Sequence, residues 1–552
     1  MHAQKMTSEP GALTPAEVAL RTGEWTRARD SFAAVVAEHP GAGAYEGLAQ
    51  ALWWLDDGPG CLEAREAAYR IYRSTDADPV GAARAATALS YDALLFGAGV
   101  AVARGWLGRA RDLLAAMPEG AEHGWLAVRE GELALAIDQD VEAARSAGDR
   151  AWAVGLRRGD VDLQFVGMAL SGRATTSAGD PASGMPRLDA AVAAATAGEV
   201  SDLMWMGKIC CWLIIACQET QDLARADEWC RRVEAICRRQ NLTPLFNVCR
   251  IQHSSILIAR GTWSHAEQGL RAVLDGAAPS RRHSRLDAVV QLGELRRRQG
   301  RWAEAEELLA QAEFHPSAIV SRAMIQLAQG EPSAAWGAVR RLIQTIPASN
   351  RLARASVLLP AVLSADAAGE RAAAIDAAEE LQETAVLMGT DALRGLAAVA
   401  AATLADDHAA EGLWRDAVRR FHDAGLPFDE AESRLRLAQA LLQTGDVGAA
   451  ANQTSTAIRD LTSLGATAAL AEAATLSRQV RTTLGRRTDG ALTKREAQVL
   501  RLVADGMNNQ QIADALVLSP HTVHRHLANI LTKLDQPTRA GATAYAITNG
   551  LL

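Results

Sequence analysis

The hexapeptide Gly261-Thr262-Trp263-Ser264-His265-Ala266 and its counterpart Gly300-Arg301-Trp302-Ala303-Glu304-Ala305, which follows 39 residues later, decide the fold of most of this chain. In both, a glycine stands two residues before a tryptophan and five before an alanine. Glycine can end a helix in a left-handed conformation. The small alanine lets the next helix approach its partner closely. The pattern therefore predicts two helices joined in a hairpin at the glycine.

The same spacing recurs through the body of the chain. Other copies are Gly23/Ala28, Gly105/Ala110, Gly330/Ala335, Gly369/Ala374 and Gly445/Ala450, and glutamine replaces glycine in Gln139/Ala144 and Gln221/Ala226. The regions around Gly179 and Asp407 are degenerate copies, and most neighbouring copies lie 39 to 42 residues apart. A single hairpin cannot cover its own apolar face, so the array predicts a stacked solenoid.

The composition favours an all-α protein. The 552 residues are too many for one compact core. Apolar residues make up 49% and aromatic residues only 5%. Alanine, leucine and arginine are abundant, and these residues lose little side-chain freedom in a helix.

The repeated pattern resembles tetratricopeptide repeats, whose helix-to-helix turn reads Gly-acid-aromatic-x-x-Ala. The resemblance covers most of residues 10–480, although each copy is degenerate and the period exceeds the usual length of about 34 residues. It implies that residues 1–484 form a solenoid that binds a protein or peptide in a concave groove. We expect its effector to be a protein, a peptide or a small molecule. An irregular all-helical domain is the alternative.

A smaller domain is predicted at residues 485–552. Residues 493–496 and 508–511 both match the capping box, in which two residues three apart bond each other's backbone. Residues 519–520 are Ser-Pro, a pair favoured at a helix start. The predicted helices cover residues 494–505, 509–516, 520–534 and 539–549.

The third of these helices has two contrasting faces. Its apolar residues follow a helical spacing: Val523, Leu527, Ile530, Leu531 and Leu534. The opposite face is polar and cationic, without an acidic residue: His521, His524, Arg525, Ala528, Asn529, Thr532 and Lys533. Such a face suits the major groove of DNA.

This region resembles the LuxR-type (NarL/FixJ-type) helix-turn-helix domain of transcriptional regulators. The matching residues run ungapped over about 60 positions: Leu492-Thr493-x-Arg495-Glu496, Val499-Leu500, Gly506-x-x-Asn509, Gln511-Ile512-Ala513, Leu516, Leu518-Ser519, Thr522-Val523-x-x-His526, Asn529-Ile530, Lys533-Leu534 and Arg539. The resemblance implies double-stranded DNA as partner. It places His524, Arg525 and Ala528 on base edges, and Thr522, His526, Asn529, Lys533 and Asn509 near phosphates.

The chain departs from the family pattern at three places. His524 stands where lysine is usual, and Ala528 cannot donate a hydrogen bond, although it can touch a thymine methyl. A scaffold protein whose terminal domain no longer binds DNA specifically is therefore the alternative function. The fourth helix, which the family often uses for dimer contacts, contains Gly541 and Thr543. A homodimer remains open.

Charge is unevenly distributed. The chain has a formal charge of −8, yet from Arg486 onward eight Lys or Arg residues face five Asp or Glu. A basic end on an acidic body suits a polyanion at that end. No apolar run is long enough to span a bilayer, and the N-terminus has no signal-peptide pattern. We therefore expect a cytoplasmic protein without membrane contact.

Several chemistries lack their motifs. No Gly-x-x-x-x-Gly-Lys-Ser/Thr loop is present, so we expect no nucleotide hydrolysis. No catalytic constellation supports an enzyme, so we expect neither catalysis nor a cofactor. Six cysteines lie between Cys210 and Cys249 without a Cys-x-x-Cys pair. Their spacing favours buried core over a redox or metal site. The cluster His521-x-x-His524-x-His526 lacks a fourth ligand, so we expect no metal there either.

Overall fold

The computed structural model describes residues 14–239, 242–276, 282–534 and 536–548. Every regular element within these ranges is a helix, which confirms the predicted all-α fold. The chain divides into two compact units, Met1–Ala400 and Ala401–Leu552.

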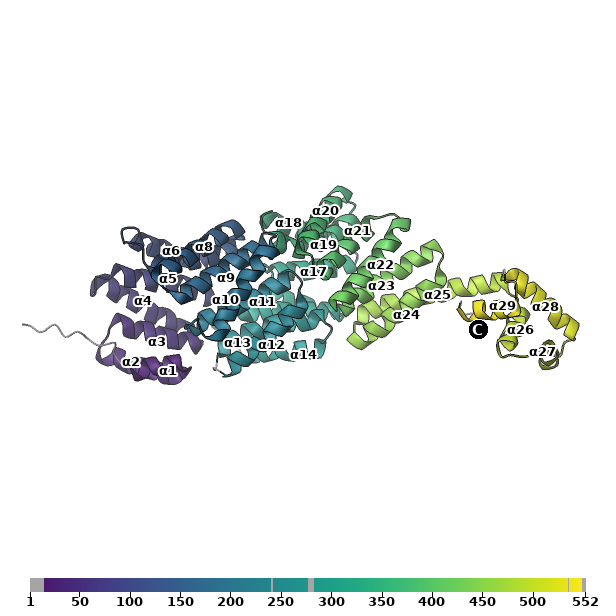
Figure 1. Cartoon of the computed structure of the whole chain (residues 1–552), viewed down its shortest axis with the longest axis horizontal. Helices are drawn as coiled ribbons and strands as arrows, with labels where there is room; N and C mark the ends of the chain where they lie inside the picture. The colour runs from purple at the N-terminus through teal and green to yellow at the C-terminus, as the bar shows by residue number, and fades with distance from the viewer. Residues whose placement is uncertain (1–13, 240–241, 277–281, 535, 549–552) are drawn as a thin grey trace, which may run out of the picture. The chain divides into compact units, whose positions relative to one another are not determined.

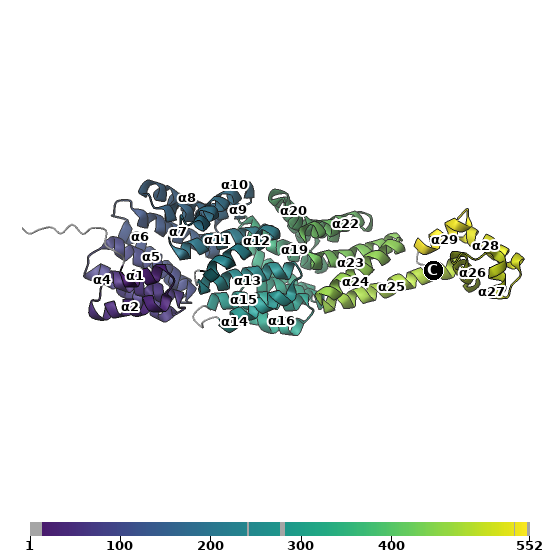
Figure 2. The same ribbon diagram turned by 60° about the horizontal axis from the view of Figure 1, so that its bottom comes forward.

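In the first unit, consecutive helices pair into hairpins that stack side by side (Figures 1 and 2). The first helices of the hairpins are α1 (Pro15–Arg21), α3 (Ala42–Trp54), α5 (Pro79–Leu95), α7 (Ala121–Leu133), α9 (Val161–Ser177), α11 (Leu203–Glu219), α13 (Thr243–Ala259), α15 (Arg282–Arg298), α17 (Pro316–Ala328) and α19 (Arg351–Ala367). The second helices are α2 (Trp25–Glu38), α4 (Gly58–Ser74), α6 (Val100–Leu114), α8 (Val141–Arg158), α10 (Pro181–Ala197), α12 (Leu223–Arg239), α14 (Trp263–Gly276), α16 (Trp302–Leu309), α18 (Pro332–Thr345) and α20 (Arg371–Met388).

The first helices lie on the inner side of this stack. From α5 to α17, each packs against the first helix of the next hairpin, and α19 also packs against α9 and α11. Among the described residues, no two second helices pack as closely as that. The stack therefore curves toward its first helices. A short π-helical turn (Ala134–Asp138) extends α7, and a 3-10 turn (Ala310–Ala312) extends α16.

Eight of the nine predicted turns are left-handed as expected. The φ angle is +77° at Gly261 and +79° at Gly300, while Gln139 and Gln221 adopt +57° and +59° without being glycine. The alanine five residues later is fully buried in all nine copies: Ala28, Ala110, Ala144, Ala226, Ala266, Ala305, Ala335, Ala374 and Ala450. This confirms that the small side chain marks close helix packing.

One predicted turn is wrong. Gly105 lies inside α6, and the turn between α5 and α6 contains instead Gly97 and Gly99, with φ angles of +82° and +100°. Gly105 is exposed, with no atom within 4 Å of where a Cβ would stand. A helix tolerates glycine at such a site at a modest cost. The sequence spacing alone did not distinguish this glycine from a helix-ending one.

The second unit continues with longer helices and ends in four short ones. After α21 (Asp391–Leu404), which crosses the division between the units, come α22 (Asp407–Ala424), α23 (Pro427–Thr444), α24 (Val447–Leu464), α25 (Thr467–Ala491), α26 (Lys494–Ala504), α27 (Asn509–Leu516), α28 (Pro520–Lys533) and α29 (Arg539–Thr548). The predicted domain boundary at residues 484/485 falls inside α25 and stays a prediction. The predicted end of the last helix, near Asn549, lies outside the described residues.

The six cysteines between Cys210 and Cys249 are buried, as their spacing predicted, and Cys61 is buried too. Within the described ranges, no three His, Cys, Asp or Glu side chains gather as metal ligands would. None of the described helices combines the length and the apolar character needed to cross a membrane.

Candidate DNA-binding interface

The four short helices α26 to α29 enclose one apolar core. Its buried members are Leu492, Val499, Leu500, Val503, Ile512, Ala513, Val523, Leu527, Ile530, Leu534, Ala542 and Ala546. Val523 and Ile530 are fully buried, which confirms the predicted phase of α28. The packing of α28 against this core determines which of its faces points outward.

Side-chain caps begin the first three of these helices, as predicted. The hydroxyl of Thr493 accepts a hydrogen bond from the backbone nitrogen of Glu496 at 3.2 Å, and the Glu496 carboxylate accepts one from the backbone nitrogen of Thr493 at 2.6 Å. The same reciprocal pair joins residues 508 and 511. At α28, Ser519 Oγ accepts from the backbone nitrogen of Thr522 at 3.1 Å. These caps fix where α28 begins.

A buried carboxylate joins α26 to α28. Glu496 is 3% exposed, and its Oε2 accepts a hydrogen bond from Lys533 Nζ at 2.6 Å. Burial opposes ionisation of this carboxyl, but the hydrogen bonds from Lys533 and Thr493 prevail and lower the pKa of Glu496 below its ordinary value. This charge-assisted bond holds the C-terminal end of α28 against α26.

Two arginines hold the short helix α27 at its ends. Arg539 Nη1 donates to Asn509 Oδ1 at 2.8 Å, and its other amino group donates to the carbonyl of Met507. At the far end, Arg495 donates to the carbonyl of Leu516. The position of α27 relative to α28 is therefore fixed by polar contacts as well as by the core.

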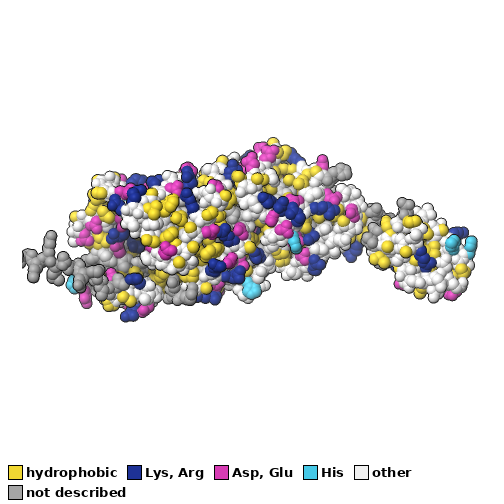
Figure 3. Space-filling view, in the orientation of Figure 1, with side chains coloured by type: hydrophobic (Ala, Val, Ile, Leu, Met, Phe, Trp, Pro, Cys, Tyr) yellow, Lys and Arg dark blue, Asp and Glu magenta, His cyan; other side chains and the backbone are white. Residues whose placement is uncertain are grey.

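The outward face of α28 is cationic. Its exposed residues are His521, His524, Arg525, Ala528, Asn529, Thr532 and Lys533, and no acidic residue occurs between Pro520 and Lys533. Figure 3 shows histidine atoms gathered on one side of this domain, whose three histidines all belong to α28. Arg525 forms no ion pair within the described part of the chain.

This region matches a known family. Residues 490–546 fit the family model described as "Bacterial regulatory proteins, luxR family". Residues 490–546 form a luxR-family helix-turn-helix domain. The match begins just before the Thr493 cap and ends within α29, so it covers three of the short helices and most of the fourth.

Curated relatives match a short part of this chain, about as long as the luxR-family domain. The transcriptional regulatory protein LiaR of Bacillus subtilis is 44% identical over 62 residues, which are 11% of this chain and 29% of LiaR. The transcriptional regulatory protein DegU of Brevibacillus brevis is 44% identical over 59 residues, 11% of this chain and 25% of DegU. The response regulator VraR of Staphylococcus aureus is 43% identical over 61 residues, 11% of this chain and 29% of VraR. The chain thus spans less than a third of these relatives.

Two solved structures resemble the chain over a larger share. A crystal structure of the APC/C hetero-tetramer Cut9–Hcn1 covers 85% of this chain and 95% of its own, with a TM-score of 0.44 and 13% identity. The yeast Tom70 structure covers 78% of this chain and 94% of its own, with a TM-score of 0.33 and 11% identity. The description of the body as a solenoid depends on its own hairpin packing.

The luxR-family domain brings some predicted site residues together and gives others internal partners. His524, Arg525, Ala528 and Asn529 share the exposed face of α28, whereas Thr522 and His526 are half-buried on its flank. Lys533 is bonded to Glu496, and Asn509 accepts from Arg539. A contact of each with DNA stays a prediction.

Sequence reasoning missed one exposed residue of the luxR-family domain. Val517, in the turn between α27 and α28, is 92% exposed and has a φ of +53°. The sequence indicated a turn there but not its handedness. A β-branched residue rarely adopts this conformation, and nothing in the sequence around it predicts the strain.

Proposed function

We propose that the protein is a DNA-binding transcriptional regulator whose helix α28 enters the major groove. The observation that carries this proposal is the exposed, acid-free face of α28 within a luxR-family domain. On this reading His524, Arg525 and Ala528 contact base edges. Thr522, His526, Asn529, Lys533 and Asn509 lie near phosphates. The Lys533 side chain is 37% exposed and has three donors, so it can bond Glu496 and a phosphate together.

We also propose that the chain binds paired half-sites as a homodimer through α29. Tyr545 and Ile547 on this helix are 38% and 65% exposed. Two copies of such an apolar face can cover each other around a twofold axis. Sedimentation of the full chain should show a dimer that Ile547→Glu dissociates. A wild-type monomer on paired half-sites would contradict this part.

The body is proposed to bind the effector that controls this DNA-binding activity. The stack offers an inner face formed by its first helices, and a solenoid of this kind presents a continuous surface to a ligand. We further propose that effector binding to the body changes the DNA-binding activity of the terminal domain.

The test begins with the full chain and a pool of random-sequence duplexes. Repeated selection should enrich one motif, and Arg525→Ala should lose preference at one base position of it. Arg501→Ala is the matched control, because Arg501 is an exposed arginine of α26 in the same domain. If selection enriches no motif, the regulator proposal fails, and the result favours a scaffold protein whose terminal domain does not bind DNA specifically.

A further inference from the structure

A cavity of about 340 Å³ lies on the inner face of the first unit. Its walls come from α3, α5 and α7, from the N-terminal ends of α9 and α11, and from one residue of α4. Five consecutive hairpins thus contribute to one site. A cavity of this size is in the range that proteins use for small molecules.

The walls are unusually aromatic for this chain. Aromatic residues are 5% of the sequence, yet five of the sixteen lining residues are aromatic: Trp53, Trp54, Tyr91, Trp125 and Trp205. The rings of Trp53 and Trp54 meet edge to face with centroids 4.9 Å apart, and those of Trp125 and Trp205 are tilted by 30° with centroids 5.1 Å apart. Ring contacts of this kind hold the walls in fixed positions.

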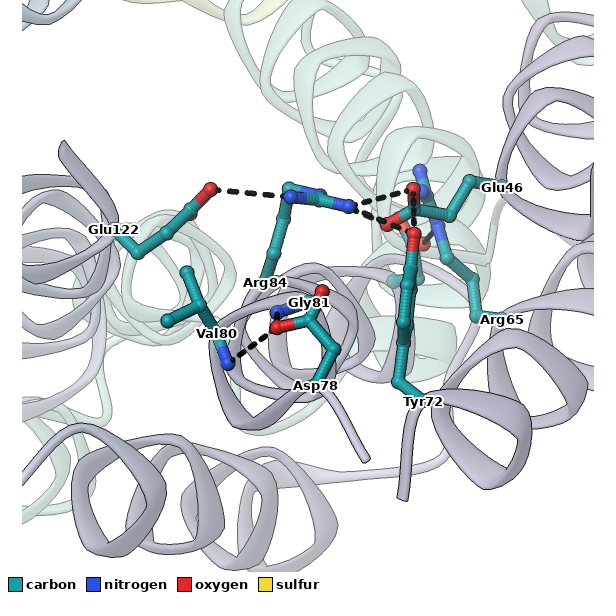
Figure 4. Close-up of polar contacts among 9 residues, drawn as sticks. Glu46, Arg65, Tyr72, Asp78, Val80, Gly81, Arg84 and Glu122 are labelled. Atoms are coloured by element: carbon teal, nitrogen blue, oxygen red, sulfur yellow. Dashed lines mark hydrogen bonds and ion pairs between the residues drawn. The ribbon is translucent and has the colours of Figure 1, made fainter. Parts of the chain in front are cut away.

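The arginines of the cavity are already neutralised. Arg65 pairs with Asp92 at 3.0 Å. Figure 4 shows Arg84 of α5 reaching between Glu46 and Glu122, at 3.0 and 3.5 Å, while it also donates to the Tyr72 hydroxyl. Arg84 thereby joins four helices. An incoming anion would therefore have to displace an existing carboxylate.

The third arginine, Arg129, also has its charge neutralised within the chain. It pairs with Glu132, and its guanidinium lies over the rings of Tyr91 and Trp205, with centroids at 4.0 and 4.3 Å. Lys208 lies 3.9 Å from the centroid of Tyr91. The aromatic walls of this cavity already stabilise cations that belong to the chain itself.

Two carboxylates of the lining have no such partner. Asp162 accepts hydrogen bonds from Ser201 and from the backbone nitrogen of Asp202, at 2.8 to 3.0 Å. Asp202 accepts from the backbone nitrogens of Met204 and Trp205, at 2.8 and 3.1 Å. Neither forms an ion pair within the described ranges. Arg129 offsets part of the negative charge of Asp202, but this arginine is already paired with Glu132.

The titration of the lining carboxyls agrees with this excess of negative charge. Burial raises the pKa of Asp202, and the neighbouring Asp162 raises it further, against hydrogen bonds from the backbone and the charge of Arg129. Burial also raises the pKa of Glu122, and Arg84 offsets only part of the effect. A bound cation would favour the ionised form of both groups.

We propose that this cavity binds a small organic cation. Its guanidinium, amidinium or primary ammonium group pairs with Asp162 and Asp202, and its body packs against Trp53 and Trp125. The inference rests on the proposed function, since it names the site and ligand class of the effector. Gln50 and the Tyr91 hydroxyl, which make no hydrogen bond to other described residues, supply further polar contacts.

Three probes of nearly equal shape test the charge requirement on the full chain. Benzamidine is a cation, benzamide is neutral and benzoate is an anion. Calorimetry and tryptophan fluorescence should show benzamidine binding at least about tenfold tighter than benzamide. Benzoate should show no binding. Equal affinity for benzamide, or no binding of benzamidine at millimolar concentration, overturns the proposal. Agmatine, tested beside benzamidine, shows whether an aliphatic body is accepted too.

Variants then locate the site. Asp202→Asn should weaken benzamidine binding at least about tenfold, and asparagine can still cap α11. Asp162→Asn should have a similar effect, and it tests the same site if Asp202→Asn fails to fold. Asp180→Asn is the matched control, because Asp180 caps α10 in the same way but lies outside the cavity. Unchanged affinity in both cavity variants overturns the assignment.

DNA binding by the same proteins separates the two proposals. Asp202→Asn without any probe should bind the selected DNA as the wild type does. If DNA binding is normal but benzamidine does not bind, the cavity inference fails and the regulator proposal stands. If benzamidine binds as expected but no DNA is selected, the reverse holds.

Discussion

The outward face of α28 and the cavity of the first unit both use charged and aromatic or imidazole side chains, but in opposite ways. On α28 the cation Arg525 is exposed and forms no ion pair with a described residue. In the cavity, Arg129 is 9% exposed, paired with Glu132 and enclosed by two rings. An open cationic face suits a long polyanion, whose binding weakens steeply with salt. A prearranged, partly buried site suits one small ligand, and its charges are screened less.

The same contrast holds beyond these two sites. In the first unit Arg296 is 2% exposed and bonded to Glu267 at 2.6 Å. Hydrogen bonds from Arg296, opposed by burial, lower the pKa of Glu267 to about 2. In the luxR-family domain the one buried carboxylate among the described residues, Glu496, serves to orient α28. Buried ion pairs thus occur in both regions, but the terminal domain also presents the exposed cationic face of α28.

The largest expected effect separates the two faces of α28. Val523→Asp places a carboxylate in a fully buried position, so we expect the terminal domain to unfold, at a cost of about 3 kcal/mol or more. Trypsin should then cleave at Arg525 and Lys533 far faster than in the wild type. Thr532→Asp, on the exposed face, should leave the domain folded and weaken DNA binding by charge repulsion. Equal protease resistance in wild type and Val523→Asp would show the phase of α28 to be wrong.

A second prediction concerns packing in the body. Ala305→Leu adds bulk at a fully buried position of α16 and should destabilise the first unit by about 1–3 kcal/mol. Ala303→Leu, at an exposed position of the same helix, is the control. All thirteen tryptophans precede residue 485, so urea unfolding followed by tryptophan fluorescence reports on the body. DNA binding should be unchanged in both variants. A weakened DNA affinity in Ala305→Leu alone would indicate that the two regions are coupled.

A third prediction sharpens the role of the open face. Arginine reads guanine through two parallel hydrogen bonds, so Arg525→Ala should lose about 1–3 kcal/mol of discrimination at one base position. The measurement is the ratio of affinities for selected and random duplexes at fixed salt. An unaltered ratio would mean that Arg525 contacts phosphate and not a base edge.

A fourth prediction tests the buried carboxylate of the terminal domain. Glu496→Gln keeps an acceptor but removes the charge, and should cost about 1–2 kcal/mol at neutral pH. The native pKa of Glu496 is lowered. Its stabilising effect is therefore present above the unfolded-state pKa of about 4.3 and is lost as pH falls through the lower native pKa. Hydrogen exchange of α26 should show the two proteins converging in acid. Asp505→Asn, at an exposed carboxylate, should show no such convergence.

The sequence predicted features that depend on a few consecutive residues. The caps at residues 493, 508 and 519 and the buried phase of α28 each follow from one or two turns of chain. Lys533 was predicted as a phosphate contact, and its bond to Glu496, 37 residues away, was not foreseen. Contacts over such distances depend on how helices pack.

The cavity could not be predicted at all. Trp53, Tyr91, Trp125 and Trp205 belong to four different helices spread over about 150 residues of sequence. Each appears in the sequence as an ordinary apolar residue of a hairpin. They meet because the stack curves toward its first helices, and that curvature is a sum of small packing angles that no local motif records.

The smallest expected effect uses the one hairpin turn that the sequence misplaced. Gly105 lies inside α6 and Gly330 has a φ of +83°, yet a Cβ at either position meets no atom within 4 Å. Glycine to alanine at these two positions therefore reports the effect of backbone conformation without a steric clash of the new methyl group. Gly105→Ala should stabilise the first unit by about 0.5–1 kcal/mol, because alanine restricts the unfolded chain and suits a helix. Gly330→Ala should destabilise it by about 1–2 kcal/mol, because a left-handed conformation crowds the Cβ. Urea unfolding followed by tryptophan fluorescence gives both values. If Gly105→Ala destabilised the first unit, Gly105 would lie in a turn, as the spacing of the sequence pattern predicted.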